Sequence, residues 1–245
     1  MIRIENVYKS FEANDVLRGV SLEIPTGESH AIIGKSGCGK SVLLKIIVAL
    51  IRPDSGKVEV DGVDIFSLND KELFEVRSKF GFLFQSAALF DSLTVAENIA
   101  LPLLENEIYT YTQKAIEKKV EEKLELVGLQ GTEKLKPSEL SGGMQKRVGL
   151  ARALVTEPEY ILYDEPTTGL DPVTSDSIDL LIKELNEKLK VTSVIVTHDL
   201  QSVKNVANKI SMLHGGKIYF SGTYEDIVNS EDEVIRKFVK RTLAK

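Results

Sequence analysis

The first third of the chain alternates apolar and polar residues over short stretches. Apolar side chains recur at about every second position in residues 1–24, and residues 56–66 repeat the pattern around Asp61 and Gly62. This period of two predicts β-strands with one buried face, joined in the second stretch by a turn. Residues 29–33 form a continuous apolar run, which suits a fully buried strand.

Helical spacing is clearest at residues 112–127, where one face is apolar, the other is rich in Lys and Glu, and Gly128 ends the helix. Another helix is predicted to begin at the capping pair Asn69 and Glu72 and to continue through Phe80. An apolar helix is expected over 42–47, and apolar residues at helical spacing predict further helices that carry 148–155 and 178–189.

Strands and helices alternate in the first and last thirds of the chain, where residues 161–163 and 193–196 form further buried-strand runs. This alternation predicts an α/β fold with a mostly parallel sheet. The stretch from 88 to 156 contains no good strand pattern and is interpreted as a helical insertion. We expect a single domain over 1–245, with an α/β core and β subdomain in 1–87 and 157–222, a helical subdomain in 88–156, and a C-terminal helical tail in 223–245.

Composition is ordinary for a globular protein: 42% of the 245 residues are hydrophobic and 28% are charged. No apolar run approaches the roughly 18 residues of a membrane span, and the first residues show no signal-peptide pattern. The lone cysteine, Cys38, excludes an internal disulfide and fits a reducing cytoplasm. A net charge of −6 disfavours nucleic acid as a partner.

Residues 34–41 read Gly-Lys-Ser-Gly-Cys-Gly-Lys-Ser and fit the phosphate-binding pattern G-x-x-x-x-G-K-[ST]. A buried strand precedes them and an apolar helix follows, which is the context that this motif requires. The glycines turn the backbone so that N–H groups and the helix dipole point at an anion. Lys40 can contact the β- and γ-phosphates, and the Ser41 hydroxyl can ligate Mg²⁺. Taken alone, the pattern also fits a simple glycine-rich turn.

Two more segments can serve phosphoryl transfer. The apolar strand 160–163 ends in Asp164, which can hold the Mg²⁺ shell, and Glu165, which can accept a proton from water. Residues 141–143, Ser-Gly-Gly, directly precede an amphipathic helix whose exposed backbone N–H groups can bind a second anion. A polar turn and an ordinary helix cap are the simpler interpretations of these two segments.

Together these residues resemble the ATP-binding cassette (ABC) ATPase family over residues 1 to about 240. The matches occur in the family's order: Phe11 as the adenine-stacking aromatic, 34–41 as Walker A, Gln85 as the Q-loop, 140–143 as the signature, 160–164 as Walker B with Glu165 as the catalytic glutamate, 169–171 as the D-loop, and His198 as the switch histidine. One departure is Met144, where most members have glutamine. Since the family's phosphate contacts come mainly from the serine and glycine backbone, we expect Met144 to alter little.

The resemblance implies a P-loop NTPase ABC ATPase fold. Its parts would be a RecA-like, mostly parallel sheet core, an N-terminal antiparallel β subdomain and a helical subdomain. It also implies ATP and Mg²⁺ as cofactors and an ATPase activity coupled to transport. The implied catalytic residues are Lys40, Gln85, Glu165 and His198, and the implied metal ligands are Ser41, Gln85 and Asp164. The implied nucleotide-binding residues are Phe11, Gly34, Lys35, Ser36, Gly37, Cys38, Gly39, Lys40, Ser41, Val42, Ser141, Gly142, Gly143 and Asp171.

Family members work as head-to-tail dimers, so the resemblance implies a homodimer. One protomer would supply residues 34–41 together with Gln85, Asp164, Glu165 and His198, and its partner would supply Ser141 and Gly143, with Asp171 linking the two sites.

Residues 39–45, 85–95 and 140–148 resemble the ATPase of the Mla phospholipid transport system more specifically. This finer resemblance implies phospholipid transport between membranes, with a multi-span permease and an MCE-domain lipid-binding protein as partners. The chain would then lie at the cytoplasmic face of the inner membrane. Two alternatives stay open: an ABC ATPase for another cargo, such as amino acids or lipoproteins, and a soluble ABC ATPase of DNA repair or translation. The second is disfavoured because the chain has neither a long coiled-coil insertion nor a second cassette.

Cys38 lies beside Lys40 and at the start of a predicted helix, and both features lower the pKa of a thiol. We therefore expect a reactive thiol whose alkylation blocks ATP hydrolysis. His30 and His214 fall in predicted strands, where packing or surface roles are expected instead of ligation. The basic segment 236–241 is predicted to be a solvated amphipathic helix.

Overall fold

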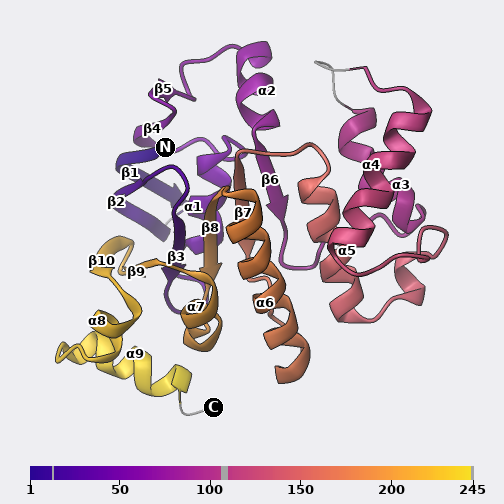
Figure 1. Cartoon of the computed structure of the whole chain (residues 1–245). Helices are drawn as coiled ribbons and strands as arrows, with labels where there is room; N and C mark the ends of the chain where they lie inside the picture. The colour runs from indigo at the N-terminus through magenta and orange to yellow at the C-terminus, as the bar shows by residue number, and fades with distance from the viewer. Residues whose placement is uncertain (13, 106–109, 244–245) are drawn as a thin grey trace.

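The computed structural model describes residues 1–12, 14–105 and 110–243 (Figure 1). The strands are β1 (Ile2–Phe11), β2 (Asn14–Ile24), β3 (Ser29–Ile33), β4 (Ser55–Val60), β5 (Val63–Asp64), β6 (Phe80–Leu83), β7 (Tyr160–Asp164), β8 (Thr192–Thr197), β9 (Lys209–His214) and β10 (Lys217–Gly222). The helices are α1 (Lys40–Ile47), α2 (Asp70–Ser78), α3 (Val95–Leu104), α4 (Gln113–Leu126), α5 (Gly142–Leu154), α6 (Pro172–Leu189), α7 (Leu200–Val206), α8 (Tyr224–Val228) and α9 (Glu233–Leu243), with a 3₁₀ turn at Pro137–Glu139.

The described strands form two sheets. The smaller sheet, β2-β1-β4-β5, is antiparallel. The larger sheet has the order β10-β9-β3-β8-β7-β6 and is parallel except where β9 pairs with β10. A mixed α/β fold with an antiparallel N-terminal sheet and a parallel core is therefore confirmed.

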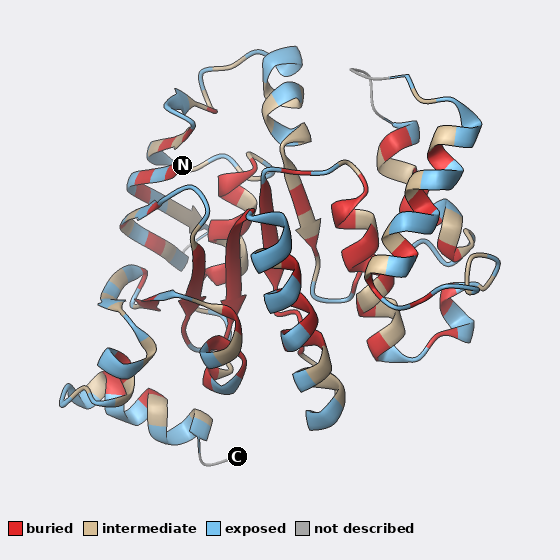
Figure 2. Ribbon diagram, viewed as in Figure 1, coloured by how far each residue is buried: buried red, intermediate tan, exposed pale blue. Residues whose placement is uncertain are grey.

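Helix α1 lies between the two sheets and joins them into one apolar core. Leu43 and Ile46 of α1 are buried in the same cluster as Ile4 of the small sheet and Ile32 and Val194 of the large one. Figure 2 shows the central strands of the large sheet as the most continuously buried part of the fold. Since α1 begins at the end of the 34–41 loop, this packing fixes the loop relative to both sheets.

Helices cover the other parts of the large sheet. Helices α3, α4, α5 and α6 share an apolar cluster with residues of β7 and β8. The tail helix α9 buries Ile235 and Phe238 in a cluster with α7 and with residues of β3 and β9, so the prediction of an amphipathic helix there is confirmed. Between residues 88 and 156, the described part of the chain contains helices and turns but no strand.

The predicted helix that continues through Phe80 is wrong at its end. Asn69 and Glu72 do form a capping box at the start of α2, but the helix ends at Ser78 and Phe80 opens strand β6. Phe80 pairs in parallel with Tyr160 of β7, and the two rings stack with their centroids 4.9 Å apart. This pairing with a distant strand outweighs the local helical spacing. An apolar residue at position 80 is compatible with either a helix or a strand.

Helix α5 crosses strand β6 at very short range. A Cβ atom built on Gly81 of β6 would lie 2.2 Å from the carbonyl oxygen of Ala153 in α5. One turn earlier, a Cβ atom on Gly149 would lie 2.9 Å from a methyl carbon of Leu83 and 3.1 Å from the Cβ of Ala87. Only glycine fits at Gly81, and the two contacts hold the last two turns of α5 directly against the sheet.

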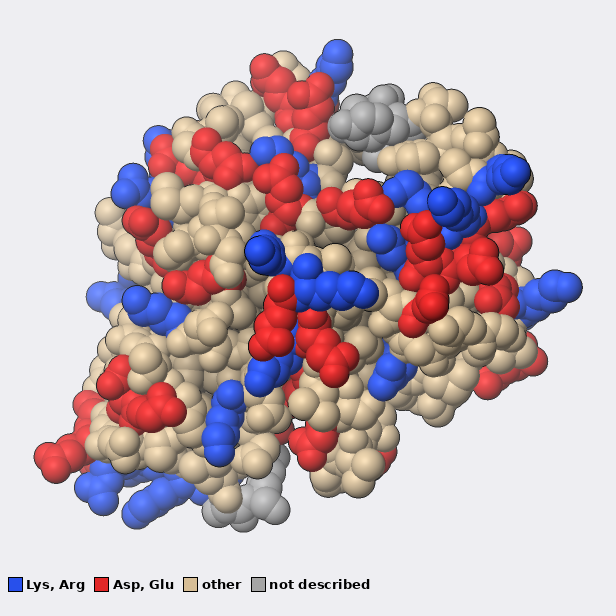
Figure 3. Space-filling view, in the orientation of Figure 1, with Lys and Arg blue, Asp and Glu red and all other residues tan. Residues whose placement is uncertain are grey.

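Basic and acidic side chains are interleaved on the face of the molecule that Figure 3 shows. This distribution accords with the net charge of −6. That the chain does not bind nucleic acid stays a prediction.

Candidate active site

The phosphate-loop motif lies where its chemistry requires, between β3 and α1. Gly39 has a φ of 105° and precedes the first residue of the helix, and a Cβ atom there would lie 2.8 Å from a methyl carbon of Val16. The Lys40 ammonium folds back over the loop and donates hydrogen bonds to the carbonyl oxygens of Gly34 and Lys35, at 3.0 and 3.3 Å. The loop therefore holds its own lysine at the start of α1.

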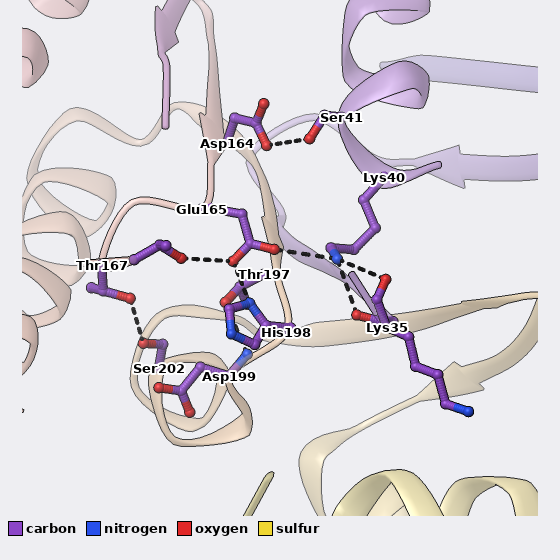
Figure 4. Close-up of polar contacts among 12 residues, drawn as sticks. Lys35, Lys40, Ser41, Asp164, Glu165, Thr167, Thr197, His198, Asp199 and Ser202 are labelled. Atoms are coloured by element: carbon purple, nitrogen blue, oxygen red, sulfur yellow. Dashed lines mark hydrogen bonds and ion pairs between the residues drawn. The ribbon is translucent and has the colours of Figure 1, made fainter. Parts of the chain in front are cut away.

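The Ser41 hydroxyl donates a hydrogen bond of 2.7 Å to a carboxylate oxygen of Asp164, at the end of β7 (Figure 4). Burial raises the pKa of Asp164 above its usual range, although the hydrogen bond from Ser41 opposes that shift. A hydroxyl and one carboxylate are the hard oxygen ligands that Mg²⁺ takes from protein when substrate phosphates supply others. These two residues therefore fit the magnesium site expected from the sequence.

Glu165 is the centre of the polar network in Figure 4. One carboxylate oxygen lies 3.2 Å from the Lys40 ammonium. The other lies 2.8 Å from Nδ1 of His198 and accepts a hydrogen bond of 3.1 Å from the Thr168 hydroxyl. The backbone of Glu165 is left-handed, with a φ of 49°, a conformation that ordinary residues rarely adopt. Strained backbone of this kind is frequent at catalytic residues.

A cavity of about 340 Å³ joins these groups. It is lined by Val16, Ser36, Gly37, Gly39, Lys40, Ser41, Val42, Gln85, Glu165, Thr168 and His198. Most of the residues predicted to bind nucleotide or act on it therefore meet in one place. Val16 and Thr168 were missed, because a valine in a strand and a threonine in a turn carry no signal of their own in the sequence.

The predicted adenine-stacking Phe11 does not line this cavity. It lies at the end of β1 with 43% of its surface exposed, and the Lys9 ammonium is 5.3 Å from the centre of its ring. The role of Phe11 in adenine binding stays a prediction.

The signature residues lie apart from the cavity, at the start of α5. Ser141 caps that helix by accepting a hydrogen bond of 3.3 Å from the Met144 amide. Asp171 caps α6 in the same way, through the Thr174 amide at 3.0 Å. The two helix starts touch, since a Cβ atom on Gly143 would lie 2.5 Å from a carbon of Thr174. Both caps therefore belong to one surface. Within a single chain, that surface lies outside the cavity that Lys40 lines.

Comparison with known proteins places this geometry in a family. A protein-family model described as "ABC transporter" matches residues 17–168, which is more than half of the chain. The chain belongs to the ABC transporter ATPase family. It is an ATPase whose hydrolysis of ATP is coupled to transport.

Curated relatives of this ABC ATPase serve different cargoes. The probable ribonucleotide transport ATP-binding protein mkl of Mycobacterium leprae is 42% identical over 97% of this chain and 68% of its own length. The methionine import protein MetN of Carboxydothermus hydrogenoformans is 42% identical over 100% and 73%. The intermembrane phospholipid transport protein MlaF of Haemophilus influenzae is 40% identical over 98% and 90%. The chain thus spans about two thirds to nine tenths of these relatives.

Among solved structures, the ABC ATPase resembles the dimeric cassette MJ0796 in a post-hydrolysis state bound to ADP and Pi. That chain is 36% identical, with a TM-score of 0.84 over 91% of this chain and 99% of the other. The cassette cbiO1 from Clostridium perfringens, part of the ABC transporter complex cbiONQ, is 29% identical with a TM-score of 0.84 over 99% of this chain and 95% of its own. The fold and the ATPase activity predicted from the motifs are both confirmed.

The prediction of an activated thiol at Cys38 is wrong. Burial raises the pKa of Cys38, and this outweighs the lowering effect of the Lys40 charge. The side chain is partly buried and packs against the apolar cluster around α1. The sequence places the charge and the helix start correctly but does not reveal this burial.

Proposed function

We propose that this ABC ATPase powers the transport of phospholipid between membranes. In this proposal it lies on the cytoplasmic face of the membrane and works with a permease and an MCE-domain lipid-binding protein. The similarity to MlaF, together with the Mla-like segment 85–95, supports this cargo. Among the residues described, no helix is long and apolar enough to span a membrane, and the family works with separate transmembrane permeases.

The observation that carries the proposal is an aromatic groove at this segment. The groove has a volume of about 610 Å³ and is lined by Phe74, Arg77, Ser78, Phe80, Gly81, Phe82, Phe84, Ala88, Phe90, Leu101, Pro102, Glu105, Arg152, Ala153 and Thr156. Phe90 is 52% exposed at its edge. An apolar groove with an aromatic anchor fits an amphipathic helix. We assign it to a cytoplasmic helix of the permease.

The segment that forms the groove also reaches the catalytic cavity. Gln85 lines that cavity, and Phe90 lies five residues further along the chain. The turn between them is held in place because the Arg152 guanidinium donates to the carbonyl oxygens of Ala87 and Ala88. A shift of the docked helix would therefore move Gln85. An ATP-driven transporter requires this kind of coupling between permease and catalytic site.

For hydrolysis we propose roles that follow the contacts. Loop 34–41 and Lys40 bind the phosphates of ATP, and Ser41, Asp164 and Gln85 hold Mg²⁺. When bound, Mg²⁺ neutralises phosphate charge and orients the phosphates. Glu165 accepts a proton from the attacking water, and His198 orients that carboxylate, which its ring contacts.

A second copy of the chain completes the site in this proposal. Ser141 and Gly143 lie at a helix N-terminus, where backbone N–H groups favour a γ-phosphate. In one chain they lie outside the cavity that Lys40 lines. A head-to-tail homodimer would bring them to the partner's nucleotide, with Asp171 beside them, and MJ0796 provides a dimeric precedent in the family.

The test is to purify this chain with its co-expressed membrane partners and reconstitute the complex in lipid vesicles. Fluorescent phospholipid should move between donor and acceptor vesicles with ATP, but not with a non-hydrolysable analogue. The complex with Glu165→Gln is the matched control and should transfer none. ATP hydrolysis without lipid transfer by an otherwise intact complex would reject the phospholipid cargo while leaving the ATPase in place.

Methionine and ribonucleotides are the competing cargoes, because MetN and mkl are as similar to this chain as MlaF. The same vesicles loaded with radiolabelled methionine or ribonucleotide test both. ATP-dependent movement of either one, with co-purification of the corresponding permease, would replace the phospholipid proposal.

A further inference from the structure

Lys146 is a buried cation that none of the family motifs explains. It lies in the second turn of α5, and only 5% of its surface is exposed. Its ammonium donates a hydrogen bond to the backbone carbonyl of Gln85 and another, of 3.3 Å, to the backbone carbonyl of Glu165. One side chain on the signature helix therefore contacts two catalytic segments at once.

The contact at Glu165 holds an unusual backbone in place. With its φ of 49°, Glu165 is kept left-handed by hydrogen bonds on both sides of the residue. Its amide donates to the carbonyl oxygen of Val196 at 2.9 Å, and its carbonyl accepts from Lys146. A left-handed conformation persists where the surrounding structure holds it in place, and these two hydrogen bonds do so for Glu165. The direction of the Glu165 carboxylate depends on the same backbone.

The contact at Gln85 acts on the other side of the catalytic cavity. Gln85 comes just before Ala87 and Ala88, which are also left-handed, with φ values of 59° and 47°. Lys146 donates to the carbonyl of Gln85 at the start of this turn, and Arg152 donates to those of Ala87 and Ala88. Gln85 therefore lines the cavity from a backbone that is fixed in this way.

We propose that Lys146 is a positioning residue for ATP hydrolysis. By tying Gln85 and Glu165 to the same point of α5, it sets the distance between the two residues and makes both follow the position of the signature helix. The carboxylates of Asp164 and Glu165 favour its charged form, against the burial that lowers the pKa of this lysine. Lys146 does not line the nucleotide cavity, so it acts through these two residues and not on the nucleotide.

The test compares Lys146→Met, which keeps most of the volume and removes every donor, with Lys146→Gln, which restores an amide NH2 group as donor. The full chain is used, and kcat, KM and the Kd for ATP are measured. Misplacement of catalytic groups by about 1 Å costs about 10²-fold, so Lys146→Met should lower kcat by about 10- to 100-fold. The Kd for ATP should stay within about threefold, and Lys146→Gln should recover part of kcat, because a donor to the carbonyls returns.

Arg147→Met is the matched control. Arg147 is the next residue of α5 and also donates to a backbone carbonyl, that of Val127 at 2.7 Å, and to the Ser177 hydroxyl at 2.8 Å, both outside the cavity. It should lower the melting temperature and leave kcat per ATP-binding molecule unchanged. The proposal would be overturned by an equal loss of kcat in Arg147→Met or by a normal kcat in Lys146→Met. If Lys146→Met does not fold, an unchanged kcat in Lys146→Gln would overturn it.

Discussion

The Lys40 ammonium lies 3.2 Å from the carboxylate of Glu165, and both side chains are largely buried. The two groups are assigned opposite tasks, one to bind phosphate and the other to take a proton from water. A phosphate at the loop competes with Glu165 for the same ammonium. Binding of ATP therefore also changes the charge that faces Glu165. Nucleotide binding is thereby linked to the ability of the Glu165 carboxylate to accept a proton.

Glu165→Gln should bind ATP and hardly hydrolyse it. The amide keeps the shape and the contacts of the side chain but cannot accept a proton, and a general base contributes about 10²- to 10⁴-fold. A steady-state phosphate-release assay measures the loss. Glu159→Gln, at the exposed start of the same strand region, is the control and should hydrolyse ATP normally. Normal turnover in Glu165→Gln would remove Glu165 from this role.

Lys40→Ala should weaken nucleotide binding itself. It removes the ammonium that the loop aims across Gly34 and Lys35, and a hydrogen bond to a charged group is worth about 1.5–3 kcal/mol, or about 10- to 100-fold in Kd. Titration calorimetry with ATP measures this effect. Lys71→Ala, exposed on α2, should bind ATP as the parent does. Unchanged affinity in Lys40→Ala would contradict the assignment.

Alkylation of Cys38 should be slow at pH 7 and should accelerate as the pH rises. Because the thiolate is the nucleophile and burial raises the pKa of Cys38, its reaction rate should keep increasing beyond the pH at which glutathione levels off. Mg-ATP should protect, since the thiol lies inside the phosphate loop, and Cys38→Ser should be active and insensitive. Iodoacetamide kinetics followed by mass spectrometry test this. We expect the added group to block ATP hydrolysis by steric obstruction of the phosphate loop. An alkylated chain that still hydrolyses ATP would contradict this.

Phe90→Ala should weaken association with the permease and leave ATP binding intact. The ring lies at the edge of the aromatic groove, half exposed, so its removal costs contact area without opening the core. Pull-down of the membrane partners and the Kd for ATP give the two readouts. Leu180→Ala on α6 removes a side chain that is 54% exposed, outside the groove, and serves as the control. Equal partner yields for Phe90→Ala and the parent would argue against docking there.

Asp179→Asn should stabilise the fold above neutral pH. Asp179 is buried beside Ser202, one carboxylate oxygen has no hydrogen-bond partner, and burial raises its pKa to about 7. The folded state thus holds a proton that the unfolded state releases at about pH 4, so this group's contribution to stability is full below pH 4 and is lost as the pH rises to about 7. With about 1.36 kcal/mol for each pKa unit, the loss is at most about 4 kcal/mol.

Urea unfolding of the parent and of Asp179→Asn at pH 5 and pH 8 measures this difference. The parent should lose stability relative to the variant between the two values. Glu184→Gln, exposed on the same helix, should follow the parent at both. A constant difference between parent and Asp179→Asn across the range would show that Asp179 does not titrate there.

The motifs made the site predictable where a residue's role depends on its neighbours in the chain. Lys40 is placed by its own loop, and Glu165 by the strand that precedes it, so both were found from the sequence. Lys146 acts through contacts with segments far away along the chain, and no local pattern marks it. Thr168 contacts Glu165 only three residues away, but a threonine in a turn carries no signal of its own. The predictions for Phe80 and Cys38 were wrong because both depend on distant contacts. Phe80 pairs with β7, and Cys38 packs against the core around α1.

The close crossing of α5 over β6 at Gly81 and Ala153 has a mechanical consequence. The last two turns of the signature helix are held against the sheet, so a rigid tilt of α5 has its pivot near that contact. At 1.5 Å per residue, Gly142 lies about 16 Å from Ala153, and a tilt of about 10° displaces it by about 3 Å. A tilt of α5 about this crossing would therefore move Ser141 and Gly143 by about the length of a hydrogen bond, and it would also change the Lys146 bonds to Gln85 and Glu165.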